Sequence, residues 1–99
     1  MERHDLPVVP RYLSVREVLD LVEALAEAEH DQWMAWARTL METEPISEAR
    51  RQRWGRYLVP YGELPEEVKE HDRLWARSTL RLLADKGIIR WGEETIPHG

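Results

Sequence analysis

The feature that most constrains the fold is a long amphipathic segment whose start is clearly marked. Ser14 is a typical N-cap residue, and Glu17 stands three positions later, which is the spacing of a capping box. Leu13 and Val18 take the positions of a hydrophobic staple around this start. Apolar residues then follow at steps of three and four, as on one face of a helix: Val15, Val18, Leu19, Val22, Leu25, Ala26, Trp33, Ala37 and Leu40, with His30 inside the stripe. The pattern predicts either one helix of about thirty residues or two helices with a break near residues 27–29.

A second amphipathic segment is delimited equally well. Pro65 fits the first position of a helix, and Gly87 fits the position just after its end, where glycine is favoured. The apolar stripe of this segment consists of Val68, Trp75, Thr79, Leu82 and Leu83, with Asp72 inside it. After the helix, residues 88–91 are expected to form one short strand.

The stretch between the two segments is irregular, basic and aromatic. Ser47 is a candidate N-cap for a short helix that Gly55 would end. Arginines at positions 50, 51, 53 and 56 surround Trp54, an arrangement suited to a local anion site. The sequence therefore predicts a mainly α fold. We expect two long antiparallel helices, a short helix or irregular basic and aromatic connection, and at most one or two short strands.

The composition excludes several classes of protein. Ninety-nine residues are enough for one domain with a modest core, and we assign residues 1–13 to an N-terminal arm, 14–91 to the domain and 92–99 to a loose tail. The net charge of −5 argues against general nucleic-acid binding. The absence of cysteine excludes disulfides and a thiolate nucleophile. No apolar run approaches the roughly 20 residues of a membrane span, and the N-terminus lacks the apolar segment of a signal peptide. We therefore expect a soluble, cytoplasmic protein that does not act at membranes.

Each helix places a titratable residue inside its apolar stripe. Burying a charge without a partner is costly, so His30 and Asp72 each need a neighbour. Either they form a structural pair that holds the two helices in register, or they contact a ligand. The five Trp and three Tyr, without any Phe, suit a partly polar cleft, because indole and phenol groups carry a polar end.

The sequence does not indicate an enzymatic or metal site. Ser78 and Thr79 have no general base at helical spacing, and the chain has no nucleophile elbow. His30, His71 and Asp72 do not form the His-x-x-x-His or Glu-x-x-His pattern that places metal ligands on one helix face. We therefore expect a non-enzyme with no catalytic residues, no metal and no cofactor.

The cationic side chains of the second helix are better candidates for binding. Lys69 and Arg73 are four residues apart and share a helix face, and the arginines of the connection could lie opposite them. Arginine offers a planar fork that suits phosphate, and Trp or Tyr faces suit a purine base. The alternative is a solvated charged face on which these cations meet Glu66, Glu70 or neighbouring acids.

An ordered string of landmarks gives a resemblance to a known family. The landmarks are Ala26-Glu27, His30, Trp33, Leu58-Val59-Pro60-Tyr61, Leu64-Pro65-Glu66, Lys69, Asp72-Arg73-x-x-Ala76, Thr79-Leu80-Arg81 and Gly87-Ile88. In this order, from about Ala24 to Ile88, they resemble the RyR domain, the small repeat named for the ryanodine receptors and also found alone in bacterial and phage proteins. Residues 41–57 depart from the family's usual Gly-Trp-x-Tyr-Gly turn and Lys-x-x-His-Pro segment, and only Trp54-Gly55 and the basic residues echo them. Trp36 and Trp75 are further departures, which point to a divergent branch.

The resemblance implies a binding module, because prokaryotic relatives look like sensors or sponges of nucleotide-derived molecules in phage–host conflict. Together with the residues, it leads us to expect a non-catalytic module for an adenine- or ADP-ribose-type nucleotide. The expected ligand contacts are Trp33, Trp54 and Tyr61 on the base, His30 and Asp72 on base or ribose, and Lys69, Arg73 and one of the arginines between Arg50 and Arg56 on phosphates. The alternative is a protein-interaction module without a small ligand, in which the aromatic residues anchor an interface. A homodimer is attractive under either reading, because one unit is half of the tandem arrangement in the receptors.

Overall fold

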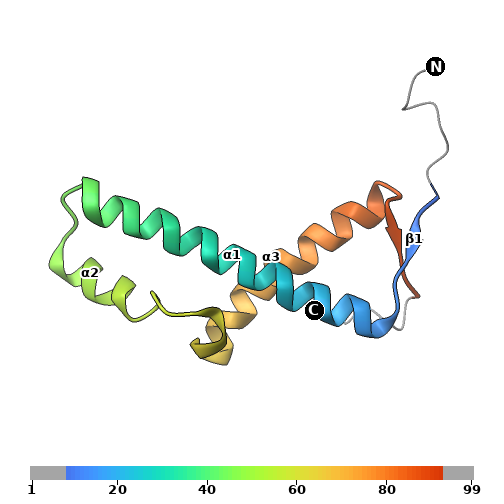
Figure 1. Ribbon diagram of the computed structural model, residues 1–99, viewed down its shortest axis with the longest axis horizontal. Coiled ribbons are helices and arrows are strands. Elements are labelled where there is room, and N and C mark those ends of the chain that lie inside the picture. Colours follow the sequence, from blue (N-terminus) through green and yellow to red (C-terminus); the bar gives the residue numbers. More distant parts are fainter. Residues whose placement is uncertain (1–8, 93–99) are drawn as a thin grey trace, which may run out of the picture.

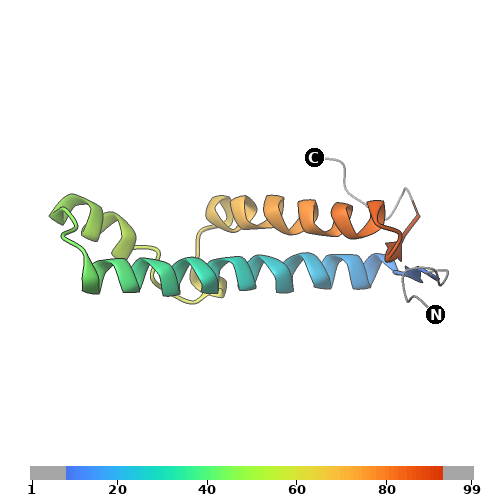
Figure 2. The same ribbon diagram turned by 90° about the horizontal axis from the view of Figure 1, so that it is seen from above.

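Two long helices that cross each other form the body of the molecule (Figures 1 and 2). The computed structural model describes residues 9–92. Helix α1 (Val15–Thr43) runs unbroken for 29 residues, and helix α3 (Glu66–Asp85) has 20 residues. The two run in opposite senses and lie in two layers, with α3 against the N-terminal half of α1 (Figures 1 and 2). The predicted mainly α fold is confirmed, and the first amphipathic segment is a single long helix.

The start of α1 has the chemistry that the sequence indicates. The Glu17 amide donates to Ser14 Oγ at 3.1 Å, and the Ser14 amide donates to Glu17 Oε1 at 3.0 Å, which completes the capping box. Leu13 and Val18, the expected hydrophobic staple, are 3% and 1% exposed. Interactions within about one helical turn therefore determine where α1 begins.

Helix α3 starts one residue later than expected and ends where expected. Pro65 takes the N-cap position instead of the first helical position, and the helix begins at Glu66. At the other end Gly87 has a φ of 76°. The Gly87 amide donates to the Ala84 carbonyl and the Ile88 amide donates to the Leu83 carbonyl, both at 3.0 Å. These two bonds form a Schellman motif, which needs a left-handed residue, and glycine adopts that conformation without strain.

Two short parallel strands pair at the end of the domain where α1 begins and α3 ends (Figure 1). Strand β1 (Arg11–Tyr12) pairs with strand β2 (Ile89–Arg90). The strand after α3 is thereby confirmed, whereas its partner comes from residues that we assigned to the N-terminal arm. Leu13, at the end of that arm, donates its amide to the Arg90 carbonyl at 2.7 Å and packs in the core. The other parts of the expected arm and tail, residues 1–8 and 93–99, lie outside the described residues.

The core lies where α3 crosses the N-terminal half of α1. Ala26 on α1 and Ala76 on α3 are 0% and 1% exposed, and their small side chains allow the two helices to approach closely. The other buried residues of this core are Leu13, Val18, Val22, Tyr61, Leu64, Leu80 and Ile89. Of the apolar stripe predicted for α1, Val18, Val22, Leu25 and Ala26 pack in this core. Val15 and Leu19, which were also expected there, are both 47% exposed.

The buried face of α3 is rotated from the face that its apolar pattern indicates. Trp75 and Leu82 are 65% and 54% exposed, and Thr79 is exposed as well, so this part of the prediction is wrong. Ala76 and Leu80, each one position further along than an expected core residue, are buried instead. An indole at the contact point would hold the two helices apart, whereas an alanine fits there. The period of the pattern does not distinguish two neighbouring faces of one helix.

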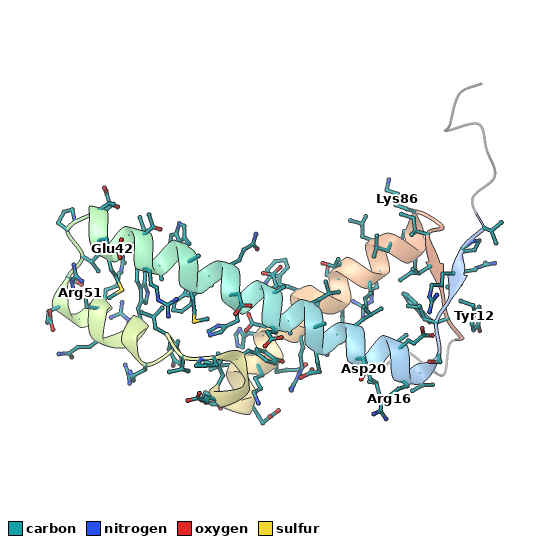
Figure 3. The ribbon with its side chains drawn as sticks, in the orientation of Figure 1. Tyr12, Arg16, Asp20, Glu42, Arg51 and Lys86 are labelled. Atoms are coloured by element: carbon teal, nitrogen blue, oxygen red, sulfur yellow. The ribbon has the colours of Figure 1, made fainter. Side chains whose placement is uncertain are left out.

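The connection contains the expected short helix, at the end of the molecule away from α3. Helix α2 (Glu48–Gly55) begins at its N-cap Ser47 and lies beside the C-terminal half of α1 (Figure 1). Arg51 lies at this end of the molecule, near Glu42 of α1 (Figure 3), and it donates to the Met41 carbonyl at 2.9 Å. A 3₁₀ turn, η2 (Tyr61–Glu63), leads from the connection into α3. The arginines of α2 consequently do not lie opposite the cations of α3.

Candidate functional site

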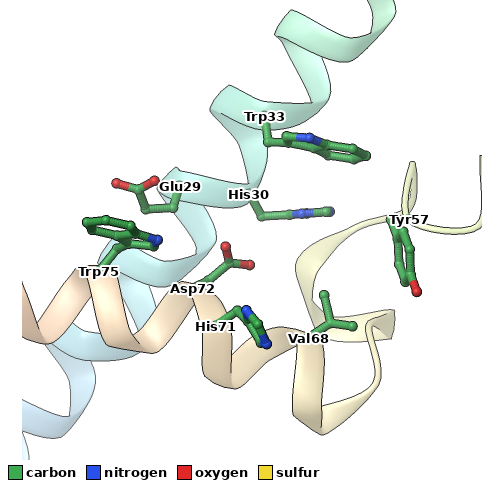
Figure 4. Close-up of a pocket in the computed structure, with 8 residues that line it drawn as sticks. All are labelled: Glu29, His30, Trp33, Tyr57, Val68, His71, Asp72 and Trp75. Carbon is green, nitrogen blue, oxygen red and sulfur yellow. The ribbon is translucent and has the colours of Figure 1, made fainter. Parts of the chain in front are cut away.

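A cleft of about 550 Å³ lies between α1, the first half of α3 and the end of the connection (Figure 4). Its lining residues come from all three parts of the chain: Glu29, His30 and Trp33 of α1, Tyr57 of the connection, and Val68, His71, Asp72 and Trp75 of α3. This volume lies within the range of about 300–1,000 Å³ that is typical of small-molecule sites. The cleft is the candidate binding site.

His30 is the buried polar residue of the cleft. Its side chain is 3% exposed, and Nε2 donates to the Val59 carbonyl at 2.7 Å. Because a carbonyl can only accept, this bond places a proton on Nε2. The ring stacks on Trp33, with centroids 5.8 Å apart and planes 19° apart, and Nδ1 has no hydrogen-bond partner within residues 9–92. His30 is therefore held rigidly while one of its ring nitrogens stays unengaged.

Asp72 belongs to the α3 wall of the cleft and is half-buried (Figure 4). Its carboxylate has neither a hydrogen bond nor an ion pair with any described residue. Burial raises the pKa of Asp72, the charge of Glu29 raises it further, and His30 and His71 oppose the shift. Of the two alternatives for His30 and Asp72, a hydrogen-bonded structural pair is not formed. The two residues line the same cleft, and no hydrogen bond joins them.

Aromatic side chains form much of the remaining cleft wall, together with Val68 and His71. Trp75 is 65% exposed, Tyr57 is 36% exposed and Trp33 is half-buried. Sequence reasoning did not select Trp75, Tyr57 or Glu29 as site residues. A helical signal existed for two of them, because Glu29 lies one turn before Trp33 and Trp75 lies one turn after Asp72. No local signal indicates Tyr57, since the fold of the connection brings it there.

Three of the expected site residues lie together outside the cleft, in a network between α1 and α3. Arg73 donates from Nε to Glu23 Oε2 at 2.7 Å and from a terminal nitrogen to Glu23 Oε1 at 3.1 Å, which is a bidentate pair. Its other terminal nitrogen reaches Glu66 at 2.9 Å. The Tyr61 hydroxyl donates to Glu23 at 3.1 Å, and Lys69 Nζ lies 5.6 Å from the centre of the Tyr61 ring. Neither cation lines the cleft.

The network changes the acidity of its members. Hydrogen bonds from Arg73 hold the pKa values of Glu23 and Glu66 below their ordinary value. Burial and the charge of Glu23 raise the pKa of Tyr61 to about 12. These shifts are those of a closed ion-pair network in which each charge already has a partner. The network therefore has a clear structural role in tying α3 to α1.

Trp54 packs behind the cleft wall. It meets Trp33 edge to face, with centroids 6.2 Å apart, and lies against Trp36 at 5.5 Å. The Arg50 guanidinium lies 5.8 Å from the Trp54 ring centre. The structure thus brings His30, Trp33 and Asp72 together in the cleft, places Trp54 against its outer wall, and separates Tyr61, Lys69 and Arg73 from it.

The crossed helices, the strand pair and the cleft beside His30 define a small helical module with a ligand-sized cleft. A family model described as RyR domain matches residues 13–89, and the chain belongs to this family. The match begins further towards the N-terminus than the landmarks that start near residue 24. Comparisons with curated proteins and with solved structures give no significant match. Within residues 9–92, no helix has both the length and the apolar character needed to cross a membrane.

Proposed function

We propose that this protein is a non-catalytic binding module that takes the base of an adenine-type ligand, such as a nucleoside or ADP-ribose, into the cleft. The observation that carries the proposal is the unengaged Asp72 carboxylate beside the rigid stack of His30 and Trp33. The half-buried carboxylate has no partner among the described residues and still reaches solvent, so it is available to accept a hydrogen bond from a ligand.

Adenine has the chemistry that these side chains favour. Its flat ring can pack against Trp33 or Trp75, and stacking of a base on an aromatic side chain contributes about 1–3 kcal/mol. Its amino group can donate to Asp72, and a ribose hydroxyl can donate to Glu29. In a cell, such a module would act as a sensor or a sponge for its ligand.

Lys69 and Arg73 do not supply a phosphate site in this arrangement. Arg73 is occupied by Glu23 and Glu66, and Lys69 lies over Tyr61. Glu29 and Asp72 in the cleft would also repel phosphate. We therefore assign recognition to the base and ribose, and we expect phosphate groups to stay outside the cleft.

Isothermal titration calorimetry with four ligands tests the proposal. Adenosine should bind, AMP and ADP-ribose should bind no more tightly, and inosine should bind at least about tenfold more weakly, because it presents a carbonyl where adenosine presents an amino group. Asp72→Asn should remove most of the discrimination between adenosine and inosine. Asp85→Asn, an exposed change on the same helix, is the matched control. No heat with any of the four ligands at millimolar concentration would refute the proposal.

The alternative is a protein-interaction or homodimerisation module, and one observation favours it. Trp36 is 53% exposed and extends the Trp54 cluster on the face formed by α2 and the C-terminal half of α1, and tryptophan is enriched at interface hot spots. Light scattering distinguishes the two functions. A dimer that Trp36→Ala converts to a monomer, in a protein that binds none of the four ligands, would favour the interaction module.

A further inference from the structure

The cleft combines hydrogen-bond acceptors and carboxylates with aromatic faces, and this combination favours a class of ligand beyond adenine-type molecules. We propose that it selects a flat cation carrying N–H donors, such as an amidinium, a guanidinium or a protonated aminoheterocycle, over the neutral molecule of the same shape. This inference rests on the proposed function only in that both place a small planar ligand in the same cleft.

The polar groups available in the cleft are mainly acceptors. Asp72 and Glu29 line it with carboxylates, and carboxylates can only accept when ionised. His30 donates from Nε2 to Val59, so in its neutral form the remaining Nδ1 is an acceptor as well. His71, which also lines the cleft, can both donate and accept when neutral. The acceptors of Asp72, Glu29 and His30 nevertheless favour a ligand that carries several N–H donors.

The cleft is lined by two carboxylates and two histidines, and His30 and His71 offset part of the negative charge at Asp72. Its lining, taken over the described part of the chain, includes Glu29 and Asp72 and neither Lys nor Arg. Neither carboxylate forms a salt bridge with a residue between 9 and 92. The two charges act on each other, since Glu29 raises the pKa of Asp72. A bound cation would relieve this repulsion, and a neutral ligand would not.

The aromatic walls favour the same class of ligand. Trp33, Trp75 and Tyr57 line the cleft from three different elements (Figure 4). The face of an aromatic ring attracts a cation, and indole is the strongest of the common side chains. Aromatic faces combined with carboxylates are a recurrent arrangement for organic cations, whereas aromatic faces combined with Lys or Arg suit phosphates.

Benzamidine and benzamide form a matched pair that differs mainly in charge, and NMR chemical-shift titration measures weak binding of both. We expect benzamidine to bind about tenfold more tightly than benzamide. Asp72→Asn and Glu29→Gln should each reduce this preference at least about threefold while benzamide binding changes little. Asp31→Asn, an exposed change on α1 next to His30 that does not line the cleft, should leave the preference intact.

Parallel titrations with adenosine separate this inference from the proposed function. Equal affinities for benzamidine and benzamide, with adenosine still bound, would overturn the cation selectivity and leave the adenine module standing. The inference would also be overturned if the preference for benzamidine over benzamide remained in both Asp72→Asn and Glu29→Gln, because the cation would then bind outside the cleft. Benzamidine selectivity without adenosine binding would support the inference and refute the adenine assignment. Binding of none of the three ligands would overturn both.

Discussion

The substitution Arg73→Met tests the role of the network that links α1 and α3. Methionine keeps much of the aliphatic stem of Arg73 and removes its charge and all of its donors. If Arg73 is a structural residue, the variant should fold, lose stability and keep the cleft intact.

The expected loss follows from the geometry. Arg73 is 19% exposed in its side chain and makes a bidentate contact with Glu23, which is 48% exposed. An exposed ion pair contributes up to about 1 kcal/mol and a hydrogen bond to a charged group about 1.5–3 kcal/mol. For this half-exposed pair we expect a loss of about 1.5 kcal/mol. In a domain of this size that corresponds to a fall of roughly 6–12 °C in Tm.

The pH dependence provides a second measurement. Arg73 holds the pKa of Glu23 below its ordinary value of 4.5. The stability that this contact contributes is therefore present above that value and is lost as the pH falls through the lowered pKa of the folded protein. Urea unfolding followed by circular dichroism should show the full difference between wild type and variant at pH 7 and a smaller one near pH 3.

Arg81→Met is the control on the same helix, because Arg81 is exposed and makes no ion pair within the described part of the chain. It should change the free energy of unfolding by less than about 0.5 kcal/mol. The reasoning is refuted if Arg73→Met behaves like this control at pH 7. It is also refuted if the loss is the same at pH 7 and pH 3.

Three further predictions follow from particular residues. Leu80→Ala should lower the free energy of unfolding by about 2–5 kcal/mol in urea unfolding, because Leu80 is 2% exposed in the core. Gly87→Ala should cost about 1 kcal/mol in the same assay, because the φ of 76° disfavours a side chain. In an ultraviolet alkaline titration, the absorbance of the Tyr61 phenolate should appear only near pH 12, the value to which burial and Glu23 raise its pKa.

Each of these predictions has a matched comparison within the chain. Leu82→Ala should have little effect, since Leu82 is 54% exposed, and a similar loss in both leucine variants would contradict the assigned core face. Gly62→Ala should be nearly neutral, because Gly62 lacks a positive φ and its added Cβ would meet no atom within 4 Å. Complete formation of tyrosinate by pH 11 in the folded protein would contradict the environment described for Tyr61.

Much of the secondary structure could be predicted because its signals are local. The capping box at Ser14, the N-cap at Ser47 and the left-handed glycine at position 87 each involve atoms a few residues apart. The apolar stripe of α1 likewise contains the residues of this helix that pack against α3. The buried face of α3 was predicted wrongly, because the apolar pattern does not show which of two adjacent faces packs against α1. Where the helices cross, a small residue such as Ala76 is required.

The candidate site could be predicted only in part. His30 and Asp72 could be selected because polar residues inside an apolar stripe need a partner. The involvement of Arg73 with Glu23 could not, because 50 residues separate them and only the crossing of the helices brings them together. Sequence spacing also placed Lys69 and Arg73 on one face of α3 without revealing that acidic and aromatic neighbours already occupy them.

By itself the sequence determined the capping signals at the helix ends, the mainly α class and the family, because these depend on contacts within a turn or on an ordered string of residues. The tertiary structure alone decided which residues share the cleft, which cations are paired and that β1 lies beside β2. The physical reason is that each of these depends on the angle and rotation at which α3 crosses α1. That geometry is determined by close packing at Ala26 and Ala76, which are far apart in the sequence.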